Sequence, residues 1–236
     1  MTDAPIRLRL LHGLGADRRA FQRFMRLLPS SWDIEALDLL GHGDAPKPAH
    51  GYSLRDHAAH IAAVLDAEAA GPFVVAGHSY GAATGVALAA VRPDLVAQLV
   101  MLDPVARIAP TLEDSVGTKR MIAAKRAGTL PSTVAAMYPE ASDALRAWTV
   151  ETWERMAIGV VDEFDLDWMT YAEAVTCPVA IIHGELEHGG GGDLSADWFD
   201  DPQVTCIPGA GHYLHATHAR EVAAALVAAV AGVARD

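Results

Sequence analysis

The sequence predicts an α/β fold: a doubly wound, mostly parallel sheet of about six strands, with helices on both faces. Short and almost continuous apolar runs indicate strands that are covered on both sides. Alanine-rich segments with helical patterning alternate with these runs, as they do where right-handed crossovers join parallel strands. One interval of about 75 residues has no strand signal and predicts a helical insertion.

The strand and helix signals follow one another along the chain. The predicted strands are residues 6–11, 33–38, 73–77, 99–103, 179–184 and 204–209. The predicted helices between and after them are residues 18–28, 53–69, 81–91 and 219–234. The last of these helices is rich in alanine and valine, which is typical of a helix packed against a sheet.

The insertion divides the chain into a core, residues 1–103 and 171–236, and a segment of three or four helices, residues 104–170, that precedes the penultimate strand. Open α/β sheets bind ligands at the carboxyl ends of their strands, so we expect the insertion to form a lid there. Large apolar residues in it are expected to line a substrate pocket. They are Met137, Trp148, Trp153, Met156 and Trp168. The alternative is that they form the core of the lid itself.

Composition and charge exclude several classes of partner. The formal net charge is −12 and no basic run offsets it, so nucleic acid is not an expected partner. No signal peptide and no apolar run of about 20 residues is present, so we expect no membrane partner and a cytoplasmic location. Cys177 and Cys206 do not form a disulfide framework and are expected to be buried thiols. The sequence does not indicate an oligomeric state.

The segment "FVVAGHSYGAATG" places Ser79 between a predicted strand and a predicted helix. A tight turn at this point strains the backbone and holds the hydroxyl above the sheet. Gly77 and Gly81 keep neighbouring chains from clashing with it. The amide of Tyr80, at the N-terminus of the helix, can face an approaching anion, and its ring is expected to line the pocket. This pattern is typical of a nucleophilic serine.

Two glycine-rich loops supply the other expected parts of a serine site. "HGLG" follows the first strand, and the amide of Leu14 in it can join that of Tyr80 as an oxyanion donor. "PGAGH" follows the last strand, and His212 there can take the proton of Ser79. The order of serine first and histidine after the final strand favours this role.

Motifs spread over nearly the whole chain now allow a comparison with a known family. "HGLG", "LDLLGHGDAPKP", "GHSYG", "VAIIHGE" and "PGAGH" occur in an order and spacing that resembles the α/β-hydrolase fold family. Only the insertion, residues 104–170, matches nothing in that pattern. The resemblance implies a Ser–acid–His hydrolase with nucleophile Ser79, base His212 and oxyanion donors Leu14 and Tyr80. The antiparallel hairpin with which many members begin is not expected, because five residues precede Ile6.

The third member of the triad is an acid for which the sequence leaves alternatives. The family pattern implies Glu187, three residues after Gly184 in "HGELE". Asp103, at the end of the strand in "VMLDP", and Asp193, after four glycines, are the rivals. Glutamate would have to place one more methylene than the commoner aspartate. The expectation at this point is therefore Glu187, with Asp103 as the alternative acid.

Other polar residues near these motifs are expected to be structural. His12, His42 and His78 adjoin glycines and should bond loop backbone with their ring nitrogens. Asp38 should brace a loop at its strand end, and Glu185 should face solvent or a loop amide. His188, Asp193, His215 and His218 have no element that would bring them together, so no metal and no cofactor is expected.

The sequence thus predicts a serine esterase that forms an acyl-enzyme on Ser79. Its substrate would be a small to medium, mainly apolar carboxylic ester, thioester or lactone. The alternative is a carbon–carbon bond hydrolase or lyase that uses the same triad, because one fold hosts many reactions. A third hypothesis, a non-catalytic ligand-binding protein, is disfavoured by the intact pair of Ser79 and His212.

Overall fold

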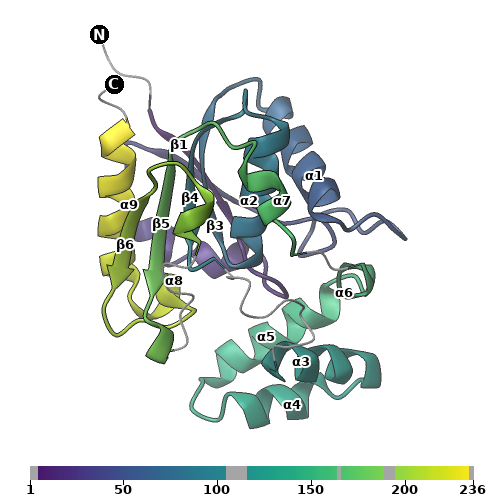
Figure 1. Ribbon diagram of the computed structural model, residues 1–236. Coiled ribbons are helices and arrows are strands. Elements are labelled where there is room, and N and C mark those ends of the chain that lie inside the picture. The colour runs from purple at the N-terminus through teal and green to yellow at the C-terminus, as the bar shows by residue number, and fades with distance from the viewer. Residues whose placement is uncertain (1–4, 105–115, 164–165, 189–194, 234–236) are drawn as a thin grey trace.

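The computed structural model describes residues 5–104, 116–163, 166–188 and 195–233. Within these residues a single sheet contains six parallel strands in the order β2-β1-β3-β4-β5-β6 (Figure 1). The strands are β1 (Arg7–Leu11), β2 (Asp33–Leu37), β3 (Phe73–His78), β4 (Val96–Leu102), β5 (Val179–Gly184) and β6 (Gln203–Ile207). The predicted fold class is therefore confirmed.

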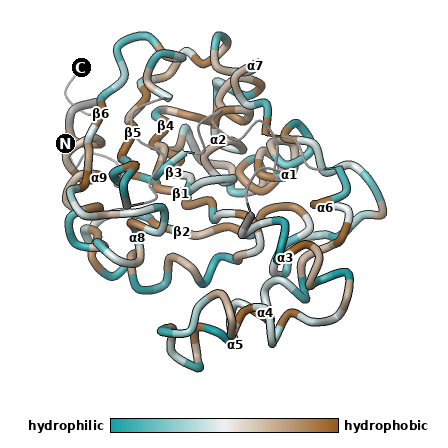
Figure 2. Tube along the Cα trace, turned by 60° about the horizontal axis from the view of Figure 1, so that its bottom comes forward, coloured by the Kyte–Doolittle hydropathy of each residue, from teal (hydrophilic) through white to brown (hydrophobic). Residues whose placement is uncertain are grey.

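Helices cover both faces of the sheet because side chains alternate along each strand. Phe73 and Val75 of β3 join one core, against α1 (Leu54–Ala67), α2 (Tyr80–Val91) and α7 (Met169–Ala172). Val74 and Ala76 join the other core, against α8 (Leu214–Thr217) and α9 (Ala219–Val233). Figure 2 shows the hydrophobic strands in the middle of the molecule, enclosed by these elements. Both faces of the sheet are buried, as the continuous apolar runs predicted.

Two predicted elements differ in detail from those observed. The expected helix at residues 18–28 consists of two short 3₁₀ helices, η1 (Arg18–Phe21) and η2 (Phe24–Leu27), which place Phe21 and Phe24 in the second core. Strand β4 begins three residues earlier than expected. Its apolar run is interrupted by Gln98, which is buried because its Nε2 donates a hydrogen bond to the Ala229 carbonyl at 3.2 Å.

Residues 116–163 of the insertion form four helices that lie beyond the carboxyl ends of the strands (Figure 1). They are α3 (Val116–Ala127), α4 (Leu130–Met137), α5 (Asp143–Arg155) and α6 (Gly159–Asp162). Their buried residues form a third hydrophobic core with Leu40 and Tyr52 of the main domain. A Cβ on Gly15 would lie 2.3 Å from the Trp153 ring, so α5 packs directly on the loop after β1. The insertion is therefore docked on the loops at this edge of the sheet.

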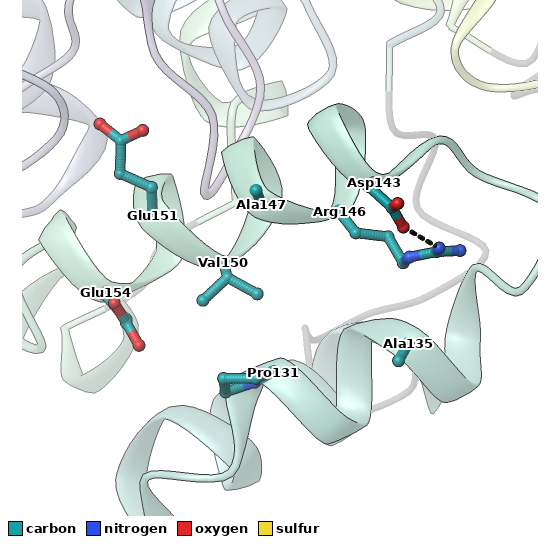
Figure 3. A pocket seen from close by; sticks show the side chains of 8 residues that line it. All are labelled: Pro131, Ala135, Asp143, Arg146, Ala147, Val150, Glu151 and Glu154. Carbon is teal, nitrogen blue, oxygen red and sulfur yellow. Dashed lines mark hydrogen bonds and ion pairs between the residues drawn. The ribbon is translucent and has the colours of Figure 1, made fainter.

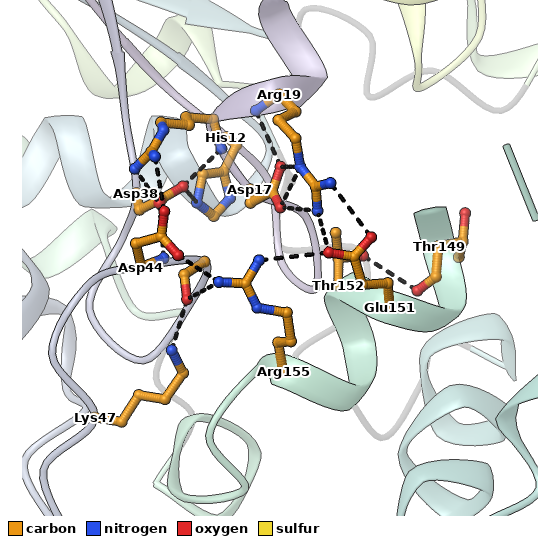
Figure 4. A network of polar contacts seen from close by, with 12 residues as sticks. His12, Asp17, Arg19, Asp38, Asp44, Lys47, Thr149, Glu151, Thr152 and Arg155 are labelled. Atoms are coloured by element: carbon orange, nitrogen blue, oxygen red, sulfur yellow. Dashed lines mark hydrogen bonds and ion pairs between the residues drawn. The ribbon is translucent and has the colours of Figure 1, made fainter. Parts of the chain in front are cut away.

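An ionic network fastens α5 to those loops (Figure 4). Glu151 accepts a hydrogen bond from Arg19 at 2.9 Å, and Arg19 also pairs with Asp17 at 2.7 Å in the loop after β1. One turn further along α5, Arg155 pairs with Asp44 in the loop after β2. Exposed ion pairs each stabilise a protein by less than about 1 kcal/mol, but a network that shares partners orients two segments relative to one another.

Two expectations about boundaries and thiols are corrected by the packing. The expected boundary at residue 170 falls inside α7, and Trp168 at its start is buried in the first core, where its ring stacks on Phe199 at 6.0 Å.

Cys206 is exposed rather than buried, because β6 is an edge strand. Cys177 is half-buried, and burial raises the pKa of its thiol to about 11.

Among the described residues, no helix combines the length and the apolar character that crossing a lipid bilayer requires.

Candidate active site

Ser79 occupies the turn between β3 and α2 with a strained backbone, φ 53° and ψ −113°. A residue other than glycine rarely adopts a positive φ, and it does so where the surroundings enforce it. At this turn the N-terminus of α2 lies close to the ends of β1 and β3. A Cβ on Gly77 would lie 2.2 Å from the Gly81 carbonyl oxygen, and one on Gly81 would lie 2.2 Å from the Leu11 carbonyl oxygen. Both glycines are needed for this close approach, which presents the Ser79 hydroxyl at the carboxyl edge of β3.

Three polar side chains form a continuous chain of hydrogen bonds at this edge. His212, in the turn between β6 and α8, has its Nε2 3.0 Å from the Ser79 hydroxyl. Its Nδ1 lies 2.6 Å from Oδ2 of Asp103. Because a carboxylate only accepts, Nδ1 carries the proton, and Nε2 is left to accept from the Ser79 hydroxyl. This is the arrangement that converts a serine into a nucleophile.

Asp103, the alternative acid, replaces Glu187 in this arrangement. Asp103 follows β4 directly, has φ 44° and is completely buried. Its Oδ1 accepts a hydrogen bond from the Gly184 amide at 2.9 Å, which aims Oδ2 at His212. Glu187 lies in an exposed 3₁₀ turn after β5, and the preference for it is corrected. The rival Asp193 lies outside the described residues.

A signal in the sequence could have favoured Asp103. The residue before a proline is driven away from the right-handed helical region, and Asp103 precedes Pro104 at the end of a central strand. Such a position is restrained, whereas Glu187 precedes His188 and is not restrained in this way.

The loop after β1 lies beside Ser79. A Cβ on Gly13 would be 3.5 Å from the Ser79 Cβ, so the Gly13–Leu14 segment borders the hydroxyl from the β1 side. Tyr80 is the first residue of α2, so its amide lies at the helix N-terminus, directly after Ser79 in the chain. The two expected oxyanion donors therefore come from neighbouring segments on either side of Ser79.

Buried histidines hold the loops around this site. The Nδ1–H of His12 donates to the Gly13 carbonyl at 2.8 Å, and its Nε2 accepts from the Leu39 amide at 3.1 Å. His42, in the loop after β2, bonds the loop after β1, because its Nε2 accepts a hydrogen bond from the Gly15 amide at 3.2 Å. The two rings thus tie the loops after β1 and β2 together, as the sequence predicted. Burial lowers the pKa of both imidazoles.

Two acidic residues also have the structural contacts expected of them. Asp38 accepts hydrogen bonds from the Arg18 amide at 2.7 Å and the Asp44 amide at 2.9 Å, which braces the loop after β2. Glu185 accepts one from the Gly209 amide at 2.8 Å and joins the loops after β5 and β6.

The predicted pocket residues divide between two cores. Trp153 and Met156 are buried in the core of the insertion, and Met137 packs against it. The ring of Tyr80 is buried in the first core, where its edge meets His57 at 5.0 Å. Trp168 also belongs to the first core, as described above, and Trp148 is half-buried on α5. The interpretation of these large residues as packing therefore holds for most of them.

The insertion carries a shallow groove of its own (Figure 3). It runs between α4 and α5 and has an apolar floor that includes Pro131, Ala135 and Val150, with Glu151 and Glu154 at its rim. It includes none of Ser79, Asp103 and His212. Among the described residues, no three His, Cys, Asp or Glu side chains are grouped as a metal site would require.

Burial of histidines makes the stability of the fold sensitive to acid. Burial lowers the pKa of His57 to about 3 and that of His215 to about 4, below the ordinary value of 6.5. The unfolded chain takes up protons below pH 6.5 that the folded chain cannot bind. Above pH 6.5 these histidines therefore do not lower the free energy of unfolding. Below that pH, each of them lowers the free energy of unfolding by up to about 1.4 kcal/mol per pH unit.

Urea unfolding at pH 7.5, 6.5 and 5.5 measures this effect. Both ring nitrogens of His57 lack a hydrogen-bond partner among the described residues, so His57→Phe removes the titration without breaking a hydrogen bond, and a shallower loss of stability with acid is expected. An unchanged slope in His57→Phe would contradict the assignment.

Comparisons with known proteins agree with this geometry. A family model described as "Alpha/beta hydrolase family" matches residues 10–225. Lipase LipV of Mycobacterium tuberculosis is 43% identical over 102 residues, which cover 43% of this chain and 38% of LipV. The pimeloyl-[acyl-carrier protein] methyl ester esterase of Neisseria meningitidis serogroup A is 36% identical over 136 residues, 53% of this chain and 42% of the esterase. The matched part thus spans less than half the length of either relative.

A solved structure extends the likeness to almost the whole chain. The enol-lactonase from Burkholderia xenovorans LB400 superposes with a TM-score of 0.77 at 20% identity, over 96% of this chain and 92% of the lactonase. At that identity the likeness establishes the fold. The family model covers residues 10–225, which is most of the chain. This chain is a member of the alpha/beta hydrolase family.

Proposed function

We propose that this protein is a serine hydrolase that cleaves a carboxylic ester, thioester or lactone through an acyl-enzyme on Ser79. The observation that carries the proposal is the unbroken chain from the Ser79 hydroxyl through His212 to Asp103. The strained backbone of Ser79 supports it, because strain of this kind is retained where it serves the site.

In the proposed mechanism the Ser79 oxygen attacks the carbonyl carbon of the substrate while Nε2 of His212 takes the hydroxyl proton. The imidazolium that forms is stabilised by Asp103, which holds Nδ1–H throughout. Collapse of the tetrahedral intermediate expels the alcohol or thiol, which receives the proton from Nε2. His212 then takes a proton from water, the resulting hydroxide attacks the acyl-enzyme, and Ser79 recovers its proton as the acid leaves.

The negative charge of each intermediate would be bound by the amides of Leu14 and Tyr80. Preorganised donors of this kind lower the barrier by about 3 kcal/mol each, because they need no reorientation when charge develops. The position of Gly13 against Ser79 and the start of α2 at Tyr80 support this assignment.

The insertion would cover the substrate as a lid. Two features support this: Trp153 packs on Gly15 in the loop after β1, and Tyr138, which follows α4, lies near Tyr213, the residue after His212. Tyr213 keeps 55% of its surface exposed. A small to medium, mainly apolar acyl or alcohol group would suit a space bounded by such rings.

The names of the relatives favour ester bonds over carbon–carbon bonds. One relative is named a lipase and another a methyl ester esterase. A third is named 2-(acetamidomethylene)succinate hydrolase and is 37% identical over 92 residues. No contact of the described residues favours cleavage of a carbon–carbon bond by the same triad.

A panel of substrates tests the proposal and decides the bond class. It contains p-nitrophenyl esters of increasing acyl length, an acyl thioester, a γ-lactone and a vinylogous diketone, with Ser79→Ala as the control. We expect turnover of at least one ester, thioester or lactone that is absent from Ser79→Ala. Cleavage of the diketone alone would replace the proposal with the carbon–carbon alternative, and activity that persists in Ser79→Ala would overturn it.

A further inference from the structure

We propose that His78, the residue before the nucleophile, is a positioning residue that fixes the base His212 relative to Ser79. The Nε2 of His78 lies 2.8 Å from the backbone carbonyl oxygen of His212. This inference rests on the proposed function, because it assigns a role in the same reaction. It concerns a residue outside the chain of hydrogen bonds that joins Ser79, His212 and Asp103.

The hydrogen bond connects two backbones that the fold otherwise holds separately. His78 is the last residue of β3 and is bonded to Ser79, so its position is set by the sheet. His212 lies in a turn between β6 and α8, and the strands β4 and β5 separate β6 from β3 in the sheet. The side chain of His78 therefore spans the gap between the base and the strand that presents the nucleophile.

The direction of the hydrogen bond follows from its acceptor. A carbonyl oxygen can only accept, so the ring must carry a proton on Nε2. The surroundings keep the ring neutral, because burial first, and then His215 and His212, hold the pKa of His78 well below its usual value. The single proton of the neutral ring is thus on Nε2, and Nδ1 faces Gly13, where an added Cβ would lie 3.0 Å away.

A column of rings holds His78 in this orientation. Phe21 of η1 lies 5.0 Å from His215 of α8, and His215 lies 4.3 Å from His78. The ring of His212 closes the column 4.8 Å beyond His78. These four rings come from three separate parts of the chain, since His212 and His215 belong to one segment. Because the His78 ring packs against both His212 and His215, it cannot turn without displacing packed side chains.

The expected consequence is kinetic. Displacement of a catalytic group by about 1 Å costs about 10²-fold in rate, because the near-attack geometry is lost. The contacts of the His212 ring with Ser79 and Asp103 set the orientation of the ring. The hydrogen bond from His78 sets the distance between the backbone of His212 and the end of β3 that carries Ser79. Loss of the His78 donor should therefore lower kcat and leave KM unchanged.

Two amide variants isolate the hydrogen bond. In His78→Gln the amide nitrogen is four bonds from Cα, as Nε2 is in histidine, so it can still donate to the His212 carbonyl. In His78→Asn the nitrogen is one bond shorter and cannot reach. Both variants lose the ring, so packing changes are shared between them. Hydrolysis of a p-nitrophenyl ester, the rate of fluorophosphonate labelling of Ser79, and Tm are measured for each.

We expect His78→Asn to lower kcat and the labelling rate by about 10²-fold at unchanged KM, and His78→Gln to recover at least a tenfold part of that loss at a similar Tm. Equal kcat in the two variants, or rates that merely follow Tm, would overturn the assignment. A wild type that neither hydrolyses the ester nor labels would overturn the proposed function, and this assignment with it.

Nitrogen-15 NMR of the wild-type imidazoles tests the same inference without a variant. Between pH 6 and 8 we expect His78 to show a protonated Nε2 and an unprotonated Nδ1. The opposite tautomer, or a ring that carries both protons, would overturn the proposal whatever the activity of the protein.

Discussion

Replacing Asp103 with asparagine is expected to lower kcat about 10⁴-fold, whereas Glu187→Gln should change it less than about twofold. Asparagine keeps the shape of the side chain, and its amide oxygen can still bond the Gly184 amide. What it then presents to Nδ1 of His212 is an N–H group, which favours the wrong imidazole tautomer and cannot stabilise an imidazolium. Without that stabilisation His212 is a poor base.

Steady-state kinetics with the best ester of the panel measures both variants, and fluorophosphonate labelling shows whether Ser79 has lost its reactivity in parallel. Glu187→Gln is the matched control, since it makes the same chemical change at an exposed acid beyond the neighbouring strand. A large loss in Glu187→Gln with little in Asp103→Asn would return the role of acid to the loop after β5.

Gly81→Ala is expected to destabilise the fold by more than about 3 kcal/mol, a large part of the roughly 5–15 kcal/mol that holds a domain together. The new Cβ would lie 2.2 Å from the Leu11 carbonyl oxygen and 2.7 Å from that of His12. These atoms belong to the end of β1 and cannot move independently of the sheet. The N-terminus of α2 would be pushed away, and the amide of Tyr80 would move with it.

Gly85→Ala, one turn further along α2, is the control for this prediction. Its Cβ would lie 2.9 Å from Cδ1 of Leu99, the mobile end of a side chain, and alanine favours a helix by about 1 kcal/mol over glycine. Its stability should therefore stay within about 1 kcal/mol of wild type. Urea unfolding followed by circular dichroism compares the two. Equal stability of Gly81→Ala and Gly85→Ala would mean that the close approach of α2 to β1 is not required.

Most of the fold could be predicted because its signals are local. Strand β5 reads as an apolar run, and Ser53 caps the N-terminus of α1 in a capping box that Asp56 completes. Strand β4 was only partly visible, because the polar side chain of Gln98 is buried against a carbonyl of α9 that lies far away in the sequence. Burial of a polar group by a distant acceptor leaves no local pattern.

The site was predictable where a motif specifies local backbone and not where the choice depends on tertiary distance. Ser79 and His212 follow from a strained turn and a loop after the last strand. The acid could not be decided from the sequence, because both Glu187 and Asp103 follow strands that end at the same edge. The packing of Trp168 on Phe199 was also missed, because the sequence does not tell whether a large apolar residue packs within the insertion or in the core of the main domain.

Labelling with a fluorophosphonate tests most directly whether the Ser79 hydroxyl is made reactive by His212. The protein is incubated with the probe at pH 7.5, and intact mass and peptide mapping locate the adduct. We expect one adduct, on Ser79, that is absent from Ser79→Ala and formed much more slowly in His212→Gln. No adduct in the wild type, an adduct on another residue, or an undiminished rate in His212→Gln would contradict a serine nucleophile activated by that imidazole.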